Sequence, residues 1–239
     1  MKRHARQRAI ISNTQMDAKL KFKVTESYKV VRTNIMFSLL KPGCKKVVVS
    51  SSLSGEGKTT TAVHVAISLA QMNLKVLLID ADLRKPKVNQ FFDFNNTPGL
   101  TNFLGHMSEM EQIVHKTEYQ NLSVICAGVI IPNPSELLAS DEMAAFLKEV
   151  ETQFDYIIID TPPLNVVVDA LPLIKLSDGV ILVVREDSST YPELNKTVKS
   201  LEMVNAKILG IILNGTKGQG KGSYQYRYGQ YDGYETYGS

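Results

Sequence analysis

A segment rich in serine and glycine, SSSLSGEGKTTT, has the residue types that bind phosphate groups. Gly55 and Gly57 allow the backbone to direct its N–H groups toward an anion. Lys58 supplies a full positive charge, and the Thr59 hydroxyl is a suitable ligand for Mg2+. The pattern G-x-x-x-x-G-K-[ST] requires glycine at position 52, where this chain has Ser52. A chance match in a polar turn is the alternative, and the strand and helix expected on either side argue against it.

The same segment supplies most of the residues that we expect to bind a nucleotide. The backbone N–H groups of the loop and of the following helix N-terminus would surround the phosphates. Asn214 ends the last expected strand and is placed to touch the adenine, although an Asn-Gly pair is also an ordinary turn. The predicted nucleotide-binding residues are Ser54, Gly55, Glu56, Gly57, Lys58, Thr59, Thr60 and Asn214.

Carboxylates follow two apolar segments that we interpret as buried strands. Asp80 and Asp82 follow residues 74–79, and they project on the same side because strand residues alternate. Two adjacent carboxylates repel one another unless a cation lies between them, and beside a phosphate loop that cation is Mg2+. An Asp-rich turn is the alternative, but it needs only one of the two residues. Asp160 ends a second apolar run, 154–159, in the manner of a Walker B strand.

A tail rich in tyrosine follows the last expected strand. After Leu213 the chain contains no Ile, Leu, Val, Met or Phe, so this segment cannot bury a core and we predict that it is disordered. The two interpretations are a low-complexity segment and a string of phosphate acceptors, and a phosphate loop on the same chain favours the acceptors. Six of the ten tyrosines lie here: Tyr224, Tyr226, Tyr228, Tyr231, Tyr234 and Tyr237.

These residues together predict phosphoryl transfer from ATP to tyrosine. Lys58 and the loop N–H groups would hold the β- and γ-phosphates, and Thr59, Asp82 and Asp160 would hold Mg2+. A tyrosine hydroxyl has a pKa near 10, so a positioned carboxylate must help to remove its proton. Asp80 is the candidate for that role and Asp82 is the second choice. The predicted catalytic residues are Lys58, Asp80, Asp82 and Asp160.

Strands that alternate with helices must position this site. The pattern predicts an α/β, P-loop NTPase-like fold with a mostly parallel central sheet and helices on both faces. Buried strands are expected at 47–49, 74–79, 122–127, 154–160, 179–184 and 208–213. Helices are expected at 25–40, 58–71, 100–104, 108–115, 141–151, 169–175 and 192–205, and a further one is expected to start with Asn133 as its N-cap, Pro134 at N1 and Glu136 at N3.

Length and composition allow one domain with short extensions. The 239 residues are 44% apolar, which is enough for a full core. We expect a basic N-terminal arm at 1–22, a P-loop kinase domain at 23–214 and a flexible tyrosine-rich tail at 215–239. The net charge of +3 is too small to indicate nucleic acid. No apolar run reaches the length of a membrane span, and two cysteines without a partner motif favour the cytoplasm.

The helix expected at 25–40 has a second, charged face. Glu26, Lys29 and Arg32 are three residues apart and lie on that face. From spacing alone, a solvated face with a Glu–Lys pair is favoured over a contact between subunits.

In these motifs the chain resembles the bacterial tyrosine kinases (BY-kinases). It resembles specifically the split type, whose kinase and membrane activator are separate chains. The resemblance covers nearly all of residues 23–239. It rests on SSLSGEGKTT as Walker A, LLIDADLRKP as the second Asp motif, DYIIIDTPP as Walker B, NPSELL, and the tyrosine cluster. ESYKVVR resembles the family's E-x-x-R-x-x-R oligomerisation element.

The resemblance implies partners and a location that the residues alone do not indicate. It implies a ring-like homo-oligomer assembled through Glu26, Lys29 and Arg32, in which a neighbouring subunit phosphorylates the tail tyrosines. It further implies a membrane-spanning activator that holds the kinase at the inner face of the membrane, control of capsular or extracellular polysaccharide synthesis, and reversal by a phosphatase. ATP and Mg2+ are the implied cofactors.

Three departures from the family pattern are visible, and none removes a catalytic group. Ser54 and Ile131 stand where the family usually has proline, and Lys29 stands where arginine is usual, which weakens bidentate pairing in a ring. The rival interpretations are a partitioning or septum-site ATPase and a nucleotide-gated assembly module. Such ATPases place a signature lysine where this chain has Leu53, and they lack a tyrosine-rich tail.

Overall fold

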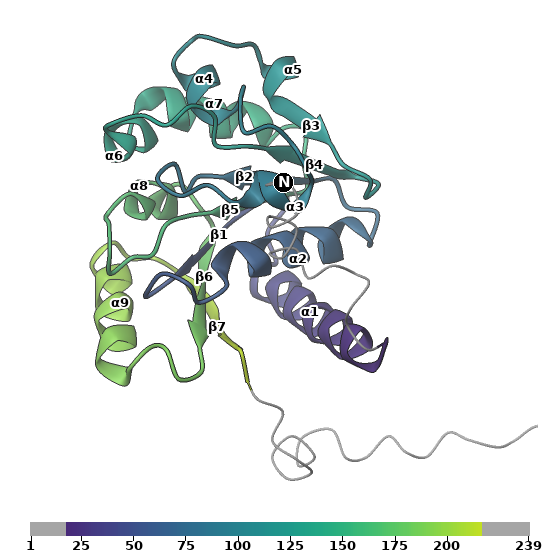
Figure 1. Ribbon diagram of the computed structural model, residues 1–239, viewed down its shortest axis with the longest axis vertical. Coiled ribbons are helices and arrows are strands. Elements are labelled where there is room, and N and C mark those ends of the chain that lie inside the picture. Colours follow the sequence, from purple (N-terminus) through teal and green to yellow (C-terminus); the bar gives the residue numbers. More distant parts are fainter. Residues whose placement is uncertain (1–17, 217–239) are drawn as a thin grey trace, which may run out of the picture.

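The computed structural model describes residues 18–216, which form a seven-stranded sheet covered by helices (Figure 1). The strand order is β3-β4-β2-β5-β1-β6-β7, and all neighbours pair in parallel except β3 with β4. The strands are β1 Lys45–Ser51, β2 Val76–Asp80, β3 Val114–Lys116, β4 Leu122–Ile125, β5 Tyr156–Asp160, β6 Gly179–Arg185 and β7 Ile208–Asn214.

Helices cover both faces of this sheet, as predicted. Helices α1 and α2 pack together on one face, while α6, α7, α8 and α9 lie on the other (Figure 1). The helices are α1 Ala18–Ser38, α2 Lys58–Ala70, α3 Val88–Phe91, α4 Leu100–Leu104, α5 Met110–Ile113, α6 Pro134–Leu138, α7 Asp141–Val150, α8 Ala170–Lys175 and α9 Tyr191–Met203.

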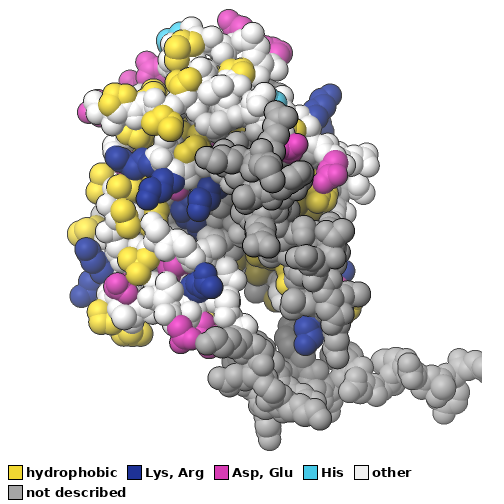
Figure 2. Space-filling model, viewed as in Figure 1, with side chains coloured by type: hydrophobic (Ala, Val, Ile, Leu, Met, Phe, Trp, Pro, Cys, Tyr) yellow, Lys and Arg dark blue, Asp and Glu magenta, His cyan; other side chains and the backbone are white. Residues whose placement is uncertain are grey.

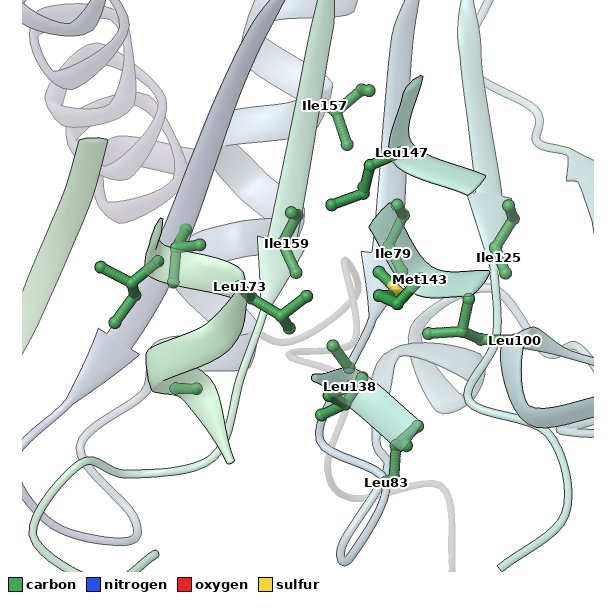
Figure 3. Packing of buried hydrophobic residues seen from close by; sticks show 14 of the residues in the cluster. Ile79, Leu83, Leu100, Ile125, Leu138, Met143, Leu147, Ile157, Ile159 and Leu173 are labelled. Carbon is green, nitrogen blue, oxygen red and sulfur yellow. The ribbon is translucent and has the colours of Figure 1, made fainter. Parts of the chain in front are cut away.

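The sheet separates two apolar clusters, because its central strands are buried on both sides. Val47 and Val49 of β1 point to the α1/α2 face, whereas Val48 points to the other. Figure 3 shows Met143 and Leu147 of α7 lying against the sheet beside Ile79 and Ile157. Helix α7 packs on the sheet through Met143, Phe146, Leu147 and Val150, which are all buried.

Parallel pairing brings the predicted carboxylates to one edge of the sheet. Strand β5 lies between β1 and β2, and Asp80 is the register partner of Asp160. Val49 of β1 is also paired with Asp160, so the loop that follows β1 starts beside both acids. This is the carboxyl edge of the strands, where open α/β sheets bind ligands.

Several sequence predictions about elements were wrong or incomplete. Residues 114–116 form the antiparallel edge strand β3 rather than the end of a helix, because pairing with β4 overrides local pattern. Helix α3 was not expected, and α1 begins at Ala18 rather than at residue 25. Met203, the last residue of α9, is 79% exposed. Asn133 is the N-cap of α6, but its side chain makes no capping hydrogen bond.

Two further predictions concern the ends of the chain and its hydrophobicity. The tyrosine-rich tail from residue 217 onward and the arm before residue 18 lie outside the described residues. Among residues 18–216, no helix has the length and hydrophobicity needed to cross a bilayer.

Candidate functional site

The loop between β1 and α2 has the backbone of a phosphate-binding loop. Gly55 and Gly57 adopt positive φ values of 86° and 93°, which glycine reaches without strain. A side chain at Gly57 would also collide with Asn214, since its Cβ would lie 2.1 Å from Nδ2 of Asn214. Helix α2 then starts at Lys58, so its first N–H groups open toward the carboxyl edge of the sheet.

Lys58 lies among the carboxylates that the sequence singled out. Its Nζ is 2.7 Å from Oδ2 of Asp82 and 3.6 Å from Oδ1 of Asp160. The Thr59 hydroxyl donates to Oδ2 of Asp160 over 2.7 Å. All four side chains are buried or nearly so, and they come from α2, the loop after β2, and β5. The structure thus brings together the predicted catalytic lysine and the predicted magnesium ligands.

Asp80 takes a different position from Asp82. Its Oδ2 accepts the backbone N–H groups of Lys87 and Val88 over 3.0 and 2.9 Å, and its Oδ1 accepts that of Asp82 over 3.2 Å. The Asp80 carboxylate therefore holds the loop that follows β2 in place. Asp82 uses one oxygen for Lys58 and the other for the backbone N–H of Lys85, 3.0 Å away.

Burial controls the charge of this cluster. It raises the pKa of Asp80 to about 7, and the nearby Asp160 carboxylate adds to the effect. Burial likewise raises the pKa of Asp160 to about 6, against the opposing influence of Lys58 and Thr59. For Lys58, burial opposes the charge, but Asp160 and Asp82 outweigh it and raise the pKa of the ammonium group. The cluster holds excess negative charge, which favours a bound cation.

The donor set suits Mg2+. Oδ1 of Asp160 is buried and has no hydrogen-bond partner, although it is 3.6 Å from the Lys58 ammonium group. With Asp82 and the Thr59 hydroxyl it offers hard oxygen ligands, and Mg2+ normally binds one or two carboxylates beside phosphate and water. In the described part of the chain, no group of three or more His, Cys, Asp or Glu side chains is placed to hold a metal ion.

Glu56 was predicted to bind nucleotide, but its side chain points into the protein. It is fully buried, and its carboxylate accepts the backbone N–H of Leu53 over 2.8 Å, that of Arg185 over 3.3 Å and the hydroxyl of Ser189. The Glu56 side chain therefore ties the phosphate loop to the segment that follows β6. The sequence did not predict the roles of Arg185 and Ser189, because no motif links residues so far along the chain from Glu56.

Asn214 lies against the phosphate loop as well. Its Nδ2 donates to the Glu56 carbonyl over 3.1 Å. The predicted contact with adenine stays a prediction. The departure at Ser52 has a structural reason, since this buried hydroxyl accepts a 2.8 Å hydrogen bond from Thr197 of α9. A glycine there would leave the Thr197 hydroxyl with one partner fewer.

A second polar cluster borders the site and was not predicted. Arg84 donates from Nε and Nη2 to the two oxygens of Asp169, over 2.6 and 3.1 Å. The Ser135 hydroxyl of α6 donates to the same carboxylate. Asp169 is almost fully buried, whereas the Arg84 side chain is 42% exposed. These bonds join the loop after β2 to α6 and to the start of α8.

The predicted oligomerisation residues make different contacts within the chain. Lys29 and Glu26 form an exposed 2.7 Å ion pair within the helix. Arg32 instead turns toward α2, where Nη1 donates to the Ser68 carbonyl over 2.9 Å. The predicted phosphorylation sites, Tyr224, Tyr226, Tyr228, Tyr231, Tyr234 and Tyr237, lie outside the described residues.

Comparison with known proteins agrees with this geometry. The AAA domain family model matches residues 44–211. The chain is 41% identical over 210 residues to tyrosine-protein kinase YwqD of Bacillus subtilis, covering 88% of each. It is 34% identical over 226 residues to the putative tyrosine-protein kinase CapB of Staphylococcus aureus, covering 95% of this chain and 99% of the relative.

Solved structures give the same result. The kinase domain of Escherichia coli tyrosine kinase ETK superposes with a TM-score of 0.78 at 31% identity, covering 85% of this chain and 80% of that one. The chimerical protein CapA2B2 reaches 0.76 at 34%, covering 79% and 83%. The septum-site protein MinD of Pyrococcus horikoshii, with Mg-ADP, reaches 0.60 at 22% and covers 71% and 70%, a likeness of fold alone. The chain belongs to the bacterial tyrosine-protein kinases.

Proposed function

We propose that this chain transfers the γ-phosphoryl group of ATP to tyrosine, and that its own tail tyrosines are acceptors. The observation that carries the proposal is the cluster of Lys58, Thr59, Asp82 and Asp160 at the end of a phosphate loop. The acceptors are part of the same chain, which gives them a high effective concentration. We further propose that transfer occurs in trans within a homo-oligomer.

The site residues have distinct tasks in this reaction. The loop N–H groups and Lys58 bind the β- and γ-phosphates and keep them in line with the acceptor. Thr59, Asp82 and Asp160 would hold Mg2+, which when bound neutralises charge on the transferring group. Asp80 accepts the tyrosine proton, and its raised pKa suits that task near neutral pH. Asp82 is the alternative acceptor.

The bonds that change are few. The tyrosine oxygen forms a bond to the γ-phosphorus while the bond from that phosphorus to the β–γ bridging oxygen breaks. ADP leaves with the electron pair of that bond, and the tyrosine proton passes to the carboxylate. The Glu56 bonds and Asn214 hold the loop in one shape, so that positioning requires little reorganisation during transfer.

The proposed setting follows from the family resemblance. A membrane-spanning activator would hold the kinase at the inner face of the membrane, a tyrosine phosphatase would reverse the reaction, and the output would be control of capsular or extracellular polysaccharide synthesis. The Glu26–Lys29 pair remains exposed on α1 and is thus free to contact a second copy in a ring.

Labelled ATP tests the activity directly. The wild-type chain, its activator segment and Mg2+ are expected to place label on tyrosine, and changing all six tail tyrosines to Phe is expected to remove most of it. Lys58→Met is expected to abolish labelling while the protein stays folded by circular dichroism. Hydrolysis of ATP without any label on tyrosine would overturn the proposal.

A further inference from the structure

The loop 81–87, which joins β2 to α3, is wrapped around the two carboxylates that follow β2. The backbone N–H of Lys85 donates to Oδ1 of Asp82, and that of Lys87 donates to Oδ2 of Asp80, each over 3.0 Å. These bonds fix the backbone of both lysines relative to the carboxylates. Their side chains therefore leave the loop next to the phosphoryl-transfer site and not at a remote surface.

The outer side of this loop is positively charged. Arg84, Lys85 and Lys87 are all exposed, and Arg84 is held by Asp169. Within residues 18–216, neither the Lys85 nor the Lys87 ammonium group forms a salt bridge. Lys and Arg side chains gather in Figure 2 where Figure 1 shows the loop that joins β2 to α3. Two ammonium groups are thus available to an anion beside the site.

We propose that Lys85 and Lys87, the basic loop pair, bind a phosphotyrosine that has already formed on a tail. The ligand class is an aryl phosphate dianion within a peptide. The inference rests on the proposed function, because that activity supplies the phosphotyrosine. Tail tyrosines are two or three residues apart, about 7–10 Å in an extended chain, so a docked phosphotyrosine holds the next acceptor near the site.

Charge explains why the pair selects the phosphorylated tail. Residues 217–239 contain three basic side chains, Lys217, Lys221 and Arg227, and two acidic ones, Asp232 and Glu235. An unphosphorylated tail is therefore not attracted to a positive loop. Each phosphate adds roughly −1.5 to −2 charge and three strong acceptors. The first phosphorylation thus creates the binding partner, and later phosphorylations become easier than the first.

The test measures binding without turnover. Two fluorescent peptides with the sequence of residues 223–233 are prepared, one unmodified and one phosphorylated at Tyr228. Each is titrated with the phosphatase-treated full chain in the absence of ATP, and anisotropy is recorded. The phosphopeptide is expected to bind about tenfold more tightly, as for a few charge-assisted hydrogen bonds, and the difference is expected to shrink with added salt.

Matched variants locate the site. Lys85→Ala/Lys87→Ala is expected to bring the ratio of the two affinities to about one. Lys85→Arg/Lys87→Arg is expected to keep the preference, because the charge remains. Lys196→Ala/Lys199→Ala removes the same charge from the exposed side of α9 and is expected to leave the ratio unchanged. Thermal unfolding of each variant shows whether it is folded. If the Ala pair is not, Lys85→Gln/Lys87→Gln, which also removes both charges, is expected to bring the ratio to about one.

The outcomes are distinct. Equal binding of both peptides by the wild-type chain would overturn the proposal, and so would a preference that survives in the Ala pair. Displacement of the phosphopeptide by an equal concentration of inorganic phosphate, or stronger binding to anionic phospholipid vesicles than to the peptide, would assign the loop to a different ligand and also overturn it. Label transfer from ATP to the unmodified peptide is measured separately, so a failure of the proposed function is recognised by itself.

Discussion

Lys58 places one ammonium group among the three buried carboxylates of Asp80, Asp82 and Asp160. The 2.7 Å contact with Asp82 and the 3.6 Å approach to Asp160 partly offset the cost of burying those charges. Each acid could be predicted from its place at a strand end. Two of the three partners of Glu56 could not be predicted, because Arg185 and Ser189 are distant in sequence and only the fold brings them close. The third partner, Leu53, is a neighbour in the same loop.

Glu56→Gln tests whether the Glu56 hydrogen bonds hold the phosphate loop in place. All three partners of the carboxylate are donors, so an amide NH2 in its place must face one of them. We expect a loss of about 1–3 kcal/mol in the free energy of unfolding, together with a KM for ATP raised about tenfold. Chemical denaturation and steady-state kinetics measure the two effects. Glu202→Gln, on the exposed side of α9, is the control. Equal stabilities and equal KM values for the two variants would contradict a role of the Glu56 carboxylate in holding the loop.

Asp169 makes stability depend on pH in the acid range. Burial opposes its charge, but the bonds from Arg84 and Ser135 outweigh this and lower the pKa of the carboxyl below its usual value. A lowered pKa contributes stability above the unfolded value of about 3.9, and that contribution is lost as pH falls through the folded pKa.

Asp169→Asn is therefore expected to be less stable than the wild type at pH 7, by about 1–2 kcal/mol because Arg84 is partly exposed to screening water. The difference is expected to shrink below about pH 4, where the Asp169 carboxyl of the unfolded chain takes up its proton while the folded one is still ionised. Urea unfolding at pH 7, 5 and 3.5 measures it. A difference that stays constant over this range would contradict a lowered pKa of the Asp169 carboxyl in the folded protein.

At the scale of elements, long apolar runs were predicted well and short edge elements were not. The runs that became β1, β2, β5 and β6 are buried on both faces, so their composition reveals them. Strand β3 has only three residues, and Val114 continued the apolar pattern of α5. Its conformation depends on pairing with β4, which lies later in the chain. Met203 is exposed because α9 ends there and the next residues turn toward β7.

Helix α1 offers a comparison between two residues of one predicted group. Arg32 bonds to the Ser68 carbonyl of α2 and has a buried Nε, whereas Lys29 pairs with Glu26 in the open. Arg32→Ala is expected to lower the free energy of unfolding by about 1–3 kcal/mol. Lys29→Ala is expected to change it by less than about 0.5 kcal/mol.

Self-association is expected to respond to Lys29→Ala, because this side chain is exposed. Sedimentation velocity compares the mass of each variant with that of the wild type.

Urea unfolding gives the stabilities of Arg32→Ala and Lys29→Ala. Equal destabilisation by these two substitutions would contradict the finding that Arg32 is packed against α2 while Lys29 is exposed.

At the scale of the whole molecule, the path of the chain links the site to its acceptors. Strand β7 ends at Asn214 beside the phosphate loop, and the tail continues from that point. Tyr224 lies ten residues beyond Asn214, so an extended chain would let it reach up to about 35 Å from the phosphate loop. A mixing experiment distinguishes transfer within one chain from the proposed transfer in trans.

The mixing experiment combines two variants, neither of which is expected to label its own tail. One is Lys58→Met with an intact tail, and the other has an intact site with all six tail tyrosines changed to Phe. With labelled ATP, Mg2+ and the activator segment, the mixture is expected to carry phosphotyrosine on the Lys58→Met chain, and neither variant alone is expected to do so. An unlabelled mixture, under conditions in which the wild-type chain labels its own tail, would contradict transfer in trans.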